Sequence, residues 1–290
     1  MRLTLTLTLT LTLTLILTLT LTLPVFAWNA VGHRIIAQIA YDQLTPQTKK
    51  QVDELTGVLF HSRYPEDRFA RASTWPDRIK KNTTAYNQWH YINLPYVNNK
   101  VTPLSVNADN VVWAINRAEK IVADPTENNF RRAKYLSFLI HFVGDIEQPL
   151  HCATLYDEQF RQGDHGGNDY LIQSPMAKNL HQLWDRGVGL FIVDQNHYQF
   201  HYYQVQTIAT RWMQDYPRTF FGTRLAVQSP EQWAQESYHI AITFAYTLPK
   251  NTAPSENYIE QGQQITREQI VLAGDRLADV LNHLYTLRYH

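Results

Sequence analysis

The sequence predicts an all-α fold, in which one domain is built from helices joined by long loops. Apolar residues recur at helical spacing along most of the chain, and the alternating pattern of strands is scarce after residue 28. No internal repeat and no Gly/Ser-rich linker divides the chain after that point. With 290 residues, the chain is long enough to enclose an ample core in one large domain.

The first helices follow from apolar spacing and from capping residues. Apolar residues at positions 35, 36, 39 and 40 share one face of a first helix, which we expect to end before Thr45. Thr45 can cap a short second helix that begins at Pro46. The segment 60–110 contains four prolines, and we expect it to be rich in loops.

Helical spacing returns in the middle of the chain. Apolar residues over 111–122 mark one helix, and the strongly apolar stretch from Tyr135 to Asp145 predicts a buried one. Residues 163–168 include three glycines and predict a loop. A short helix is expected over 179–185.

Three further helices are expected towards the C-terminus. Residues 204–216 have helical periodicity, and the sequence SPEQ at 229–232 has the cap, proline and glutamine of a helix start. The sequence TREQ at 266–269 has the spacing of a capping box, and we expect it to open the last helix.

Charge and cysteine content exclude several classes of protein. Lysine plus arginine equals aspartate plus glutamate, 26 against 26, which argues against a protein that grips duplex DNA with a broad basic face. A small nucleic-acid substrate held by metal ions stays possible. Cys152 is the single cysteine, so an intrachain disulfide is excluded, while twelve histidines is a high number.

Residues 1–27 predict a signal peptide. Arg2 precedes an alternating Leu-Thr run, and Val25 and Ala27 are small residues at the −3 and −1 positions of a cleavage site after Ala27. Cleavage would export the chain to the periplasm or the medium and leave 28–290 as a single mature domain. The long run also allows an uncleaved membrane anchor, or a low-complexity tract with strand-like alternation.

Histidine and aspartate recur at a spacing that suits a metal site. In the sequence HFVGDIEQPLH, His141 and Asp145 lie four residues apart on one helix face, and His151 follows after a proline. The sequence HQLWD repeats the spacing with His181 and Asp185. Either pair alone can be a helix-surface pair, but side chains of this kind inside an apolar helix must be paired or bind metal.

Three more residues complete the candidate set. Asp77 in TWPDRIK and His90 in QWHYIN lie in the segment expected to be loop, and His33 follows Trp28 by five residues. Imidazole and carboxylate groups together favour zinc, and the absence of a cysteine cluster argues against a purely structural zinc site.

These motifs give the sequence its resemblance to the S1/P1 nuclease family, which shares its helical fold with the zinc-dependent phospholipases C. The resemblance runs from Trp28 to the last helix. It rests on the initial Trp with a His five residues later, on W-x-D-x-x-[RK], H-[FY]-[IV], H-F-[IV]-G-D-x-x-Q-P-L-H and G-G-N, and on the later H-x-x-x-D. All nine positions of the family's metal ligands match.

The resemblance implies three zinc ions. It implies one ion held by Asp77, His90, His141 and Asp145, and a third held by His151, His181 and Asp185. It implies a second ion held by Trp28, His33 and Asp145, with Asp145 bridging two ions. The family's first Trp binds through its free amino group and carbonyl oxygen, so removal of the leader would complete the site.

The resemblance also implies a reaction and a substrate. A zinc-bound hydroxide would attack phosphorus in line, with Asp77 orienting it, Lys80 adding positive charge and Asp145 bridging the two ions. The products would be 5′-mononucleotides from single-stranded DNA or RNA, with 3′-nucleotidase activity expected as well.

Four residues are expected to contact substrate. Tyr91 follows the His90 ligand and would stack on a base, unless it is an ordinary core tyrosine. Asn93 stands where fungal members carry Asp, so a fungal-type base preference does not follow. Gly167 and Asn168 of the G-G-N match are the further candidates.

Two other functions stay open: the first uses the same zinc core, and the complete ligand set argues against the second. One is a secreted zinc-dependent phospholipase C that binds a lipid headgroup, and the other is an inactive, zinc-stabilised binding protein. The sequence favours the nuclease, acting on single-stranded nucleic acid or nucleotides. We expect a monomer without stable membrane association once the leader is removed.

Overall fold

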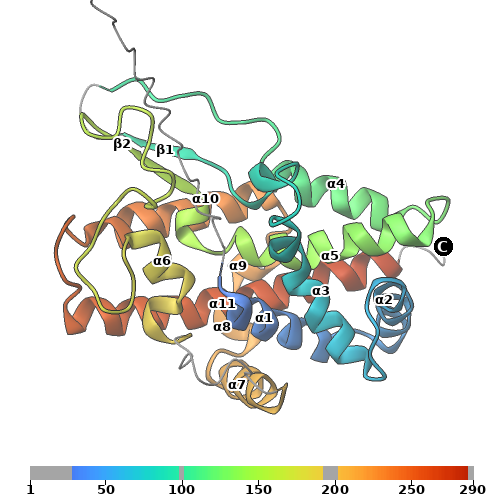
Figure 1. The fold of residues 1–290 in the computed structure, drawn as a ribbon. Helices are drawn as coiled ribbons and strands as arrows, with labels where there is room; N and C mark the ends of the chain where they lie inside the picture. The colour runs from blue at the N-terminus through green and yellow to red at the C-terminus, as the bar shows by residue number, and fades with distance from the viewer. Residues whose placement is uncertain (1–27, 98–100, 192–201, 287–290) are drawn as a thin grey trace, which may run out of the picture.

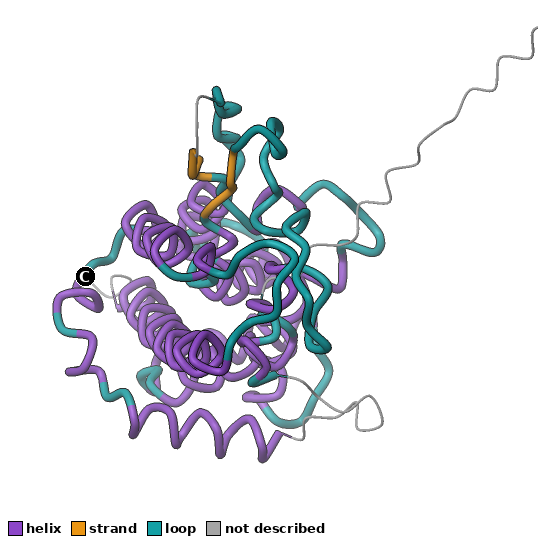
Figure 2. The backbone as a smooth tube through the Cα atoms, turned by 90° about the vertical axis from the view of Figure 1, so that its left-hand side faces the viewer, coloured by secondary structure: helices purple, strands orange, loops and turns teal. Residues whose placement is uncertain are grey.

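The computed structural model describes residues 28–97, 101–191 and 202–286. The predicted signal peptide, residues 1–27, lies outside these ranges. Within them the chain is mostly helical, as the sequence predicts, with one small sheet (Figures 1 and 2). Among the described helices, none is long and apolar enough to span a lipid bilayer.

The described α-helices follow one another along the whole chain. They are α1 (Ala30–Asp42), α2 (Pro46–Leu59), α3 (Pro65–Ile79), α4 (Val111–Ala123), α5 (Asn129–Asp145), α6 (Leu180–Asp185), α7 (Tyr202–Asp215), α8 (Arg218–Phe221), α9 (Thr223–Ala226), α10 (Pro230–Thr243) and α11 (Glu256–Thr286). Four 3-10 turns join them: η1 (Asn87–His90), η2 (Pro149–His151), η3 (Gly187–Gly189) and η4 (Ala245–Thr247).

Helix α5 lies at the centre of the molecule. It packs against α2, α3, α4 and α11, and the side chains from Tyr135 to Asp145 are all buried. An apolar surface on every side of a helix is the mark of a core helix. Its C-terminal end therefore carries His141 and Asp145 into the interior, where other elements can reach them.

Helix α1 is held between α3 and α11. Gly274 of α11 permits the close approach, because a Cβ atom there would lie 2.4 Å from Ile39 Cγ2 of α1. Gly144 of α5 likewise lets α5 approach α1 closely, since a Cβ atom there would lie 3.0 Å from His33 Nδ1. These two contacts set the position of His33 beside α5.

The only strands among the described residues are β1 (Leu94–Val97) and β2 (Ala153–Tyr156). They pair in parallel, with Leu94 opposite Ala153 and Val97 opposite Tyr156. The pairing extends to the residues before both strands, since Ile92 N donates to His151 O at 2.8 Å. The small sheet thus fixes the segment after His90 beside the segment after His151.

Two sequence-based boundaries are wrong. The loop expected over 60–110 contains α3, where Pro65 occupies the first turn and Pro76 lies inside the helix. The last helix begins at Glu256, ten residues before the capping box, and Thr266 lies within it. There the Thr266 hydroxyl donates to Gly262 O at 2.8 Å, one turn back in the same helix.

Candidate metal centre

The first group of polar side chains comes from three elements. Asp77 lies near the end of α3, His90 ends η1, and His141 and Asp145 lie one turn apart on α5; all four are buried. His90 Nδ1 lies 2.8 Å from Asp145 Oδ2 and 3.1 Å from His141 Nε2. His141 Nε2 lies 3.6 Å from Asp77 Oδ1.

His33 adds a second group that shares Asp145. Its Nε2 lies 3.2 Å from Asp145 Oδ1, and its ring stacks on that of His141 with centroids 3.9 Å apart. Asp145 therefore presents one oxygen to His33 and the other to His90 and His141. A bridging carboxylate needs this division of its two oxygens.

The third group consists of His151, His181 and Asp185. His181 Nε2 lies 3.5 Å and His151 Nε2 lies 4.0 Å from Asp185 Oδ1. The backbone links this group to the first, because His151 Nδ1 donates to His90 O at 2.7 Å. All sequence-predicted side-chain ligands thus lie in three buried groups that can hold metal ions.

Backbone carbonyls determine which ring nitrogen faces each group. The Nδ1 atoms of His141, His151 and His181 lie 2.6, 2.7 and 2.7 Å from the carbonyl oxygens of Ser73, His90 and Gly166. A carbonyl oxygen only accepts, so Nδ1 carries the proton in each ring. Each Nε2 is then left with a lone pair towards the carboxylates, the arrangement that ligating histidines adopt.

The distances and the unpaired atoms fit metal ions. Ligand atoms on a tetrahedral zinc at about 2.0–2.1 Å lie roughly 3.3 Å apart, and nitrogen–oxygen separations around Asp77 and Asp145 run from 2.8 to 3.9 Å. His151 Nε2 and Asp145 Oδ1 are buried without a hydrogen-bond partner. Buried polar atoms of this kind are rare unless something else binds them.

Protonation suits ligation at His33, His90 and Asp145. Burial lowers the pKa of His33, and burial with the nearby Lys80 lowers the pKa of His90 to about 3, so both rings are neutral. Although burial alone would raise it, the His141 imidazole and its neighbours hold the pKa of Asp145 well below its usual value. A neutral imidazole and an ionised carboxylate are the forms that bind metal. His141 differs: burial alone would lower its pKa, but the Asp145 and Asp77 carboxylates raise it, and a bound cation would favour the neutral ring.

Asp185 differs from the other carboxylates of the centre. Burial raises its pKa well above the usual value, although Gln148 Nε2 donates to Asp185 Oδ1 at 2.7 Å. Without a cation, the third group therefore holds a neutral carboxyl. A bound cation would favour the ionised form.

Lys80 and Trp28 lie at the edge of these groups. Lys80 Nζ pairs with Asp77 Oδ1 at 2.9 Å, one turn along the chain. Trp28 is fully buried, with its ring centroid 6.1 Å from that of Phe191. The next residue, Asn29, donates its backbone N–H to Asp185 O at 2.8 Å, so the chain before α1 is tied to the third group.

The predicted substrate contacts lie around the small sheet. Tyr91 is partly buried directly after His90, and Asn93 Oδ1 accepts a bond of 3.1 Å from Thr154 Oγ1. Thr154 Oγ1 in turn accepts the Gly166 N–H at 2.9 Å. Asn168 is tied to its own loop, because its Nδ2 donates to His165 O at 2.8 Å.

Gly166 and Gly167 shape the loop that carries Asn168. Both have positive φ angles, of 64° and 83°. A Cβ atom at Gly166 would lie 2.4 Å from Leu150 O, so glycine is needed for the loop to approach η2. Gly167 O accepts the His181 N–H at 3.2 Å, which places the loop against the third group.

Sequence reasoning missed a buried ionic network behind the centre. Glu147, two residues after Asp145, pairs with Arg276 of α11 at 2.6 Å and accepts a bond of 3.0 Å from Gln269. Arg276 also pairs with Glu236 of α10 at 2.9 Å. An arginine within the apolar run of the last helix was the available signal, because it needs a buried partner.

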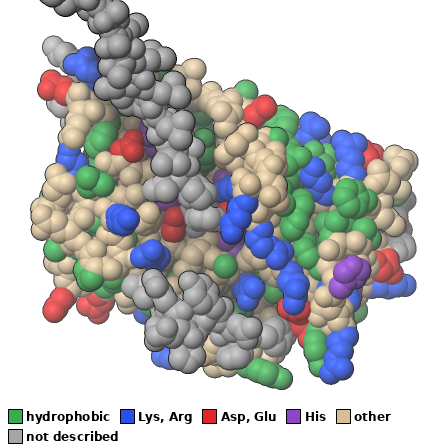
Figure 3. Space-filling model, in the orientation of Figure 1, with side chains coloured by type: hydrophobic (Ala, Val, Ile, Leu, Met, Phe, Trp, Pro, Cys, Tyr) green, Lys and Arg blue, Asp and Glu red, His purple; other side chains and the backbone are tan. Residues whose placement is uncertain are grey.

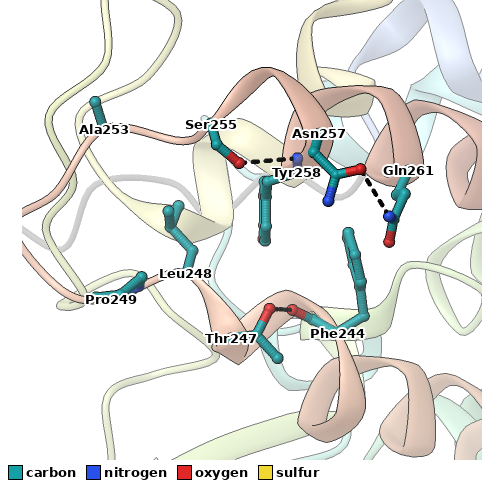
Figure 4. A pocket seen from close by; sticks show the side chains of 9 residues that line it. All are labelled: Phe244, Thr247, Leu248, Pro249, Ala253, Ser255, Asn257, Tyr258 and Gln261. Carbon is teal, nitrogen blue, oxygen red and sulfur yellow. Dashed lines mark hydrogen bonds between the residues drawn. The ribbon is translucent and has the colours of Figure 1, made fainter.

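A cavity of about 350 Å³ lies between η4 and the start of α11 (Figure 4). Its polar side chains are bonded locally: Ser255 Oγ accepts from Tyr258 N, and Asn257 Oδ1 accepts from Gln261 Nε2. None of its lining residues belongs to the three groups. The cavity is therefore separate from the three groups.

Three groups of buried imidazoles and carboxylates define the class: a mostly helical protein with a centre able to hold several metal ions. The S1/P1 nuclease family model matches residues 28–286, and the chain belongs to that family. Endonuclease 4 of Arabidopsis thaliana is 25% identical over 283 residues, 89% of either chain. Nuclease P1 of Penicillium citrinum is 26% identical over 169 residues, 54% of this chain and 57% of its own.

The predicted resemblance is therefore confirmed, and so is the fold class. Membership in the family makes this chain a nuclease, a hydrolase that acts on the phosphodiester bonds of nucleic acids.

Proposed function

We propose that this chain hydrolyses single-stranded DNA or RNA to 5′-mononucleotides and removes phosphate from 3′-nucleotides, with three zinc ions. The observation that supports this most directly is the sharing of Asp145 between His33 on one oxygen and His90 and His141 on the other. Zinc in such a site supplies positive charge and a nucleophile at neutral pH. The predicted ligands are Trp28, His33, Asp77, His90, His141, Asp145, His151, His181 and Asp185.

The residues of the chain would act on the nucleophile and on the phosphate. Asp77, at the wall of the first group, accepts a hydrogen bond from the attacking water and orients it in line with phosphorus. Lys80, paired with Asp77 at 2.9 Å, adds positive charge beside the phosphate oxygens as charge develops there. The bond from phosphorus to the 3′-oxygen breaks, so the phosphate stays on the 5′ side.

The segments around the small sheet would hold the base. Tyr91 stacks on it, and Asn93 and Asn168 offer amide groups to its edge, with Gly167 placing the second amide. Stacking requires an unpaired base, which gives the preference for single strands. We further propose that 28–290 is the catalytic domain of a monomer, exported to the periplasm or medium after cleavage behind Ala27.

The test compares substrates on one preparation of the chain beginning at Trp28. Single-stranded DNA, RNA and 3′-AMP are each incubated with and without a chelator, beside lipid vesicles as the phospholipase substrate. We expect 5′-mononucleotides and free phosphate, lost on chelation and restored by zinc, and about three zinc ions by elemental analysis. Hydrolysis of vesicles alone, or one metal ion per active chain, would refute the proposal.

A further inference from the structure

A group of arginines lies beside the metal centre, although the chain as a whole is electrically balanced, with 26 basic and 26 acidic residues. Arg34 lies on α1, and Arg71 and Arg78 lie on α3. We call these three residues the arginine patch. Figure 3 shows Lys and Arg side chains gathered on the part of this face where Figure 1 places α1 and α3.

The patch begins at the edge of the centre. Arg34 directly follows His33, and Arg78 directly follows Asp77. Arg71 lies two residues before Ser73, whose carbonyl oxygen accepts the proton of His141. Two different helices thus carry an arginine next to a residue of the first two groups.

The three guanidinium groups have few partners among the described residues. Arg71 Nε pairs with Asp67 at 2.9 Å, while Arg78 donates only weakly to Arg71 O at 3.5 Å. Arg34 Nε is buried and has no hydrogen-bond partner. Helix α1, which carries Arg34, packs against α3, which carries Arg71 and Arg78, so the three charges lie on neighbouring helices. One carboxylate does not balance them.

Like charges gathered with only one carboxylate partner favour an anionic ligand. The planar guanidinium binds phosphate through two parallel hydrogen bonds. Arg71 and Arg78 are exposed and lie two helical turns apart, about 10 Å along α3. Successive phosphates of a stacked strand advance by about 3.4 Å, so the two arginines span a few nucleotides.

We propose that the arginine patch binds the phosphodiester backbone of a single strand beside the cleavage site. This inference rests on the proposed function. A mononucleotide has no further phosphate to reach the patch, whereas an oligonucleotide does. The patch would therefore make the enzyme select polymers over nucleotides, through affinity that falls as salt rises.

The experiment uses the double variant Arg71→Gln/Arg78→Gln of the intact, metal-loaded protein. The matched control is Arg131→Gln/Arg211→Gln, which removes two arginines from exposed i,i+4 ion pairs elsewhere. Binding of a labelled 12-nucleotide phosphorothioate oligothymidylate, which keeps its charges and resists hydrolysis, is followed by fluorescence anisotropy over a range of salt concentrations.

We expect the Kd of the patch variant to rise about tenfold at low salt. The slope of log Kd against log salt should fall by about 1.4, roughly 0.7 for each lost phosphate contact. The control variant should match the wild type. Equal Kd values and slopes for all three proteins, or a wild type that does not bind the probe, would overturn the inference.

Hydrolysis separates this inference from the proposed function. The same preparations are given unmodified oligothymidylate and 3′-AMP, and we expect the ratio of their KM values to rise about tenfold in the patch variant. A wild type that binds the probe but cleaves neither substrate refutes the proposed function and leaves the patch standing. A patch variant that cleaves normally, with the same probe binding and the same KM ratio as the wild type, refutes the patch and leaves the proposed function standing.

Discussion

The centre depends on which nitrogen each histidine ring gives to the backbone. Ser73 O and Gly166 O hold the Nδ1 protons of His141 and His181, and this determines where Nε2 faces. The carbonyl acceptors belong to α3 and to the glycine loop, so residues outside the ligand set orient the ligands. Groups of this kind typically change metal affinity or activity by 10–100-fold when they are lost.

Asp145 is expected to be the least replaceable side chain. Asp145→Asn leaves only one acceptor oxygen where His33, His90 and His141 now share two. We expect a loss of kcat on single-stranded DNA of at least about 100-fold, with fewer zinc ions bound. Tyr91→Ala should mainly raise KM, because Tyr91 is not a predicted ligand. Greater activity in the Asp145 variant than in the Tyr91 variant would contradict this assignment.

Asp164 should give the stability of the protein a distinctive pH dependence. Burial raises its pKa from 3.8 to about 6, and its oxygens accept bonds from Leu155 N and Tyr246 Oη. Between about pH 4 and 6 the folded chain keeps a proton that the unfolded chain releases, so this contribution to the free energy of unfolding falls as pH rises.

Asp164→Asn removes that dependence because an amide does not titrate. From pH 4 to 7 the variant should gain on the order of 2–3 kcal/mol relative to wild type, at about 1.4 kcal/mol per pKa unit. Denaturant titrations at several pH values measure this difference. Asp215→Asn, at an exposed position of α7, is the control. If the free energy of unfolding changes with pH equally in wild type and Asp164→Asn, the Asp164 carboxyl titrates normally.

Among the elements, regular apolar spacing was enough to predict α1, α4 and α5, and the cap, proline and glutamine of SPEQ were enough to predict α10. Apolar spacing failed for α3, since Pro65 and Pro76 read as loop signals although one occupies the first turn and the other is tolerated in the interior. The capping box misplaced the start of α11, because its spacing also occurs inside helices. Local signals fix an element only where tertiary packing agrees with them.

The ligand set could be predicted because its members recur at short spacings within HFVGDIEQPLH and HQLWD. The supporting contacts could not, because they join distant parts of the chain. Arg276 and Glu147 are 129 residues apart, and His141 and Ser73 are 68 apart. Neither partner of such a contact indicates the other in a single sequence.

Gly274 is expected to be essential for the packing of α11 on α1. Gly274→Ala would put Cβ 2.4 Å from Ile39 Cγ2, and overpacking of this kind costs about 1–3 kcal/mol. The control is Gly57→Ala in α2, where a Cβ atom meets only the end of the flexible Arg68 side chain, Nε at 3.8 Å and Cζ at 4.0 Å, and the helix should gain about 1 kcal/mol. Thermal melts measure the stability of both variants against the wild type. A Gly274 variant as stable as wild type would show that α1 can shift freely.

Over the whole molecule, the centre exists only when distant segments meet. Its side chains come from α1, α3, η1, α5, η2 and α6, between positions 33 and 185. Buried imidazoles and carboxylates at such close distances are costly without a cation. Metal that binds only the folded chain stabilises it by an amount that grows with the logarithm of its concentration relative to Kd, so chelation should remove the centre and lower the thermal stability together.

The start of α1 gives the last prediction, that a residue added before Trp28 disturbs the centre. Trp28 is buried, Asn29 N donates to Asp185 O, and Asn29 O accepts the His33 N–H at 3.3 Å, so this segment lies between two of the groups. A terminal amine there, with a pKa of about 7.7–8.0 when free, can bind metal after losing its proton. An amide nitrogen has no such lone pair.

Chains beginning at Trp28 and at Ala27 are therefore compared for zinc content, thermal stability and nuclease rate. We expect the longer chain to fold, to lose about one zinc ion of three and to cleave single-stranded DNA far more slowly, because the remaining ligands lie elsewhere in the chain. The activity of the chain beginning at Trp28 should fall on the acid side, as protons compete with metal for the amine. Equal rates and equal zinc content in both chains would show that Trp28 is a packing residue and that leader removal does not complete the centre.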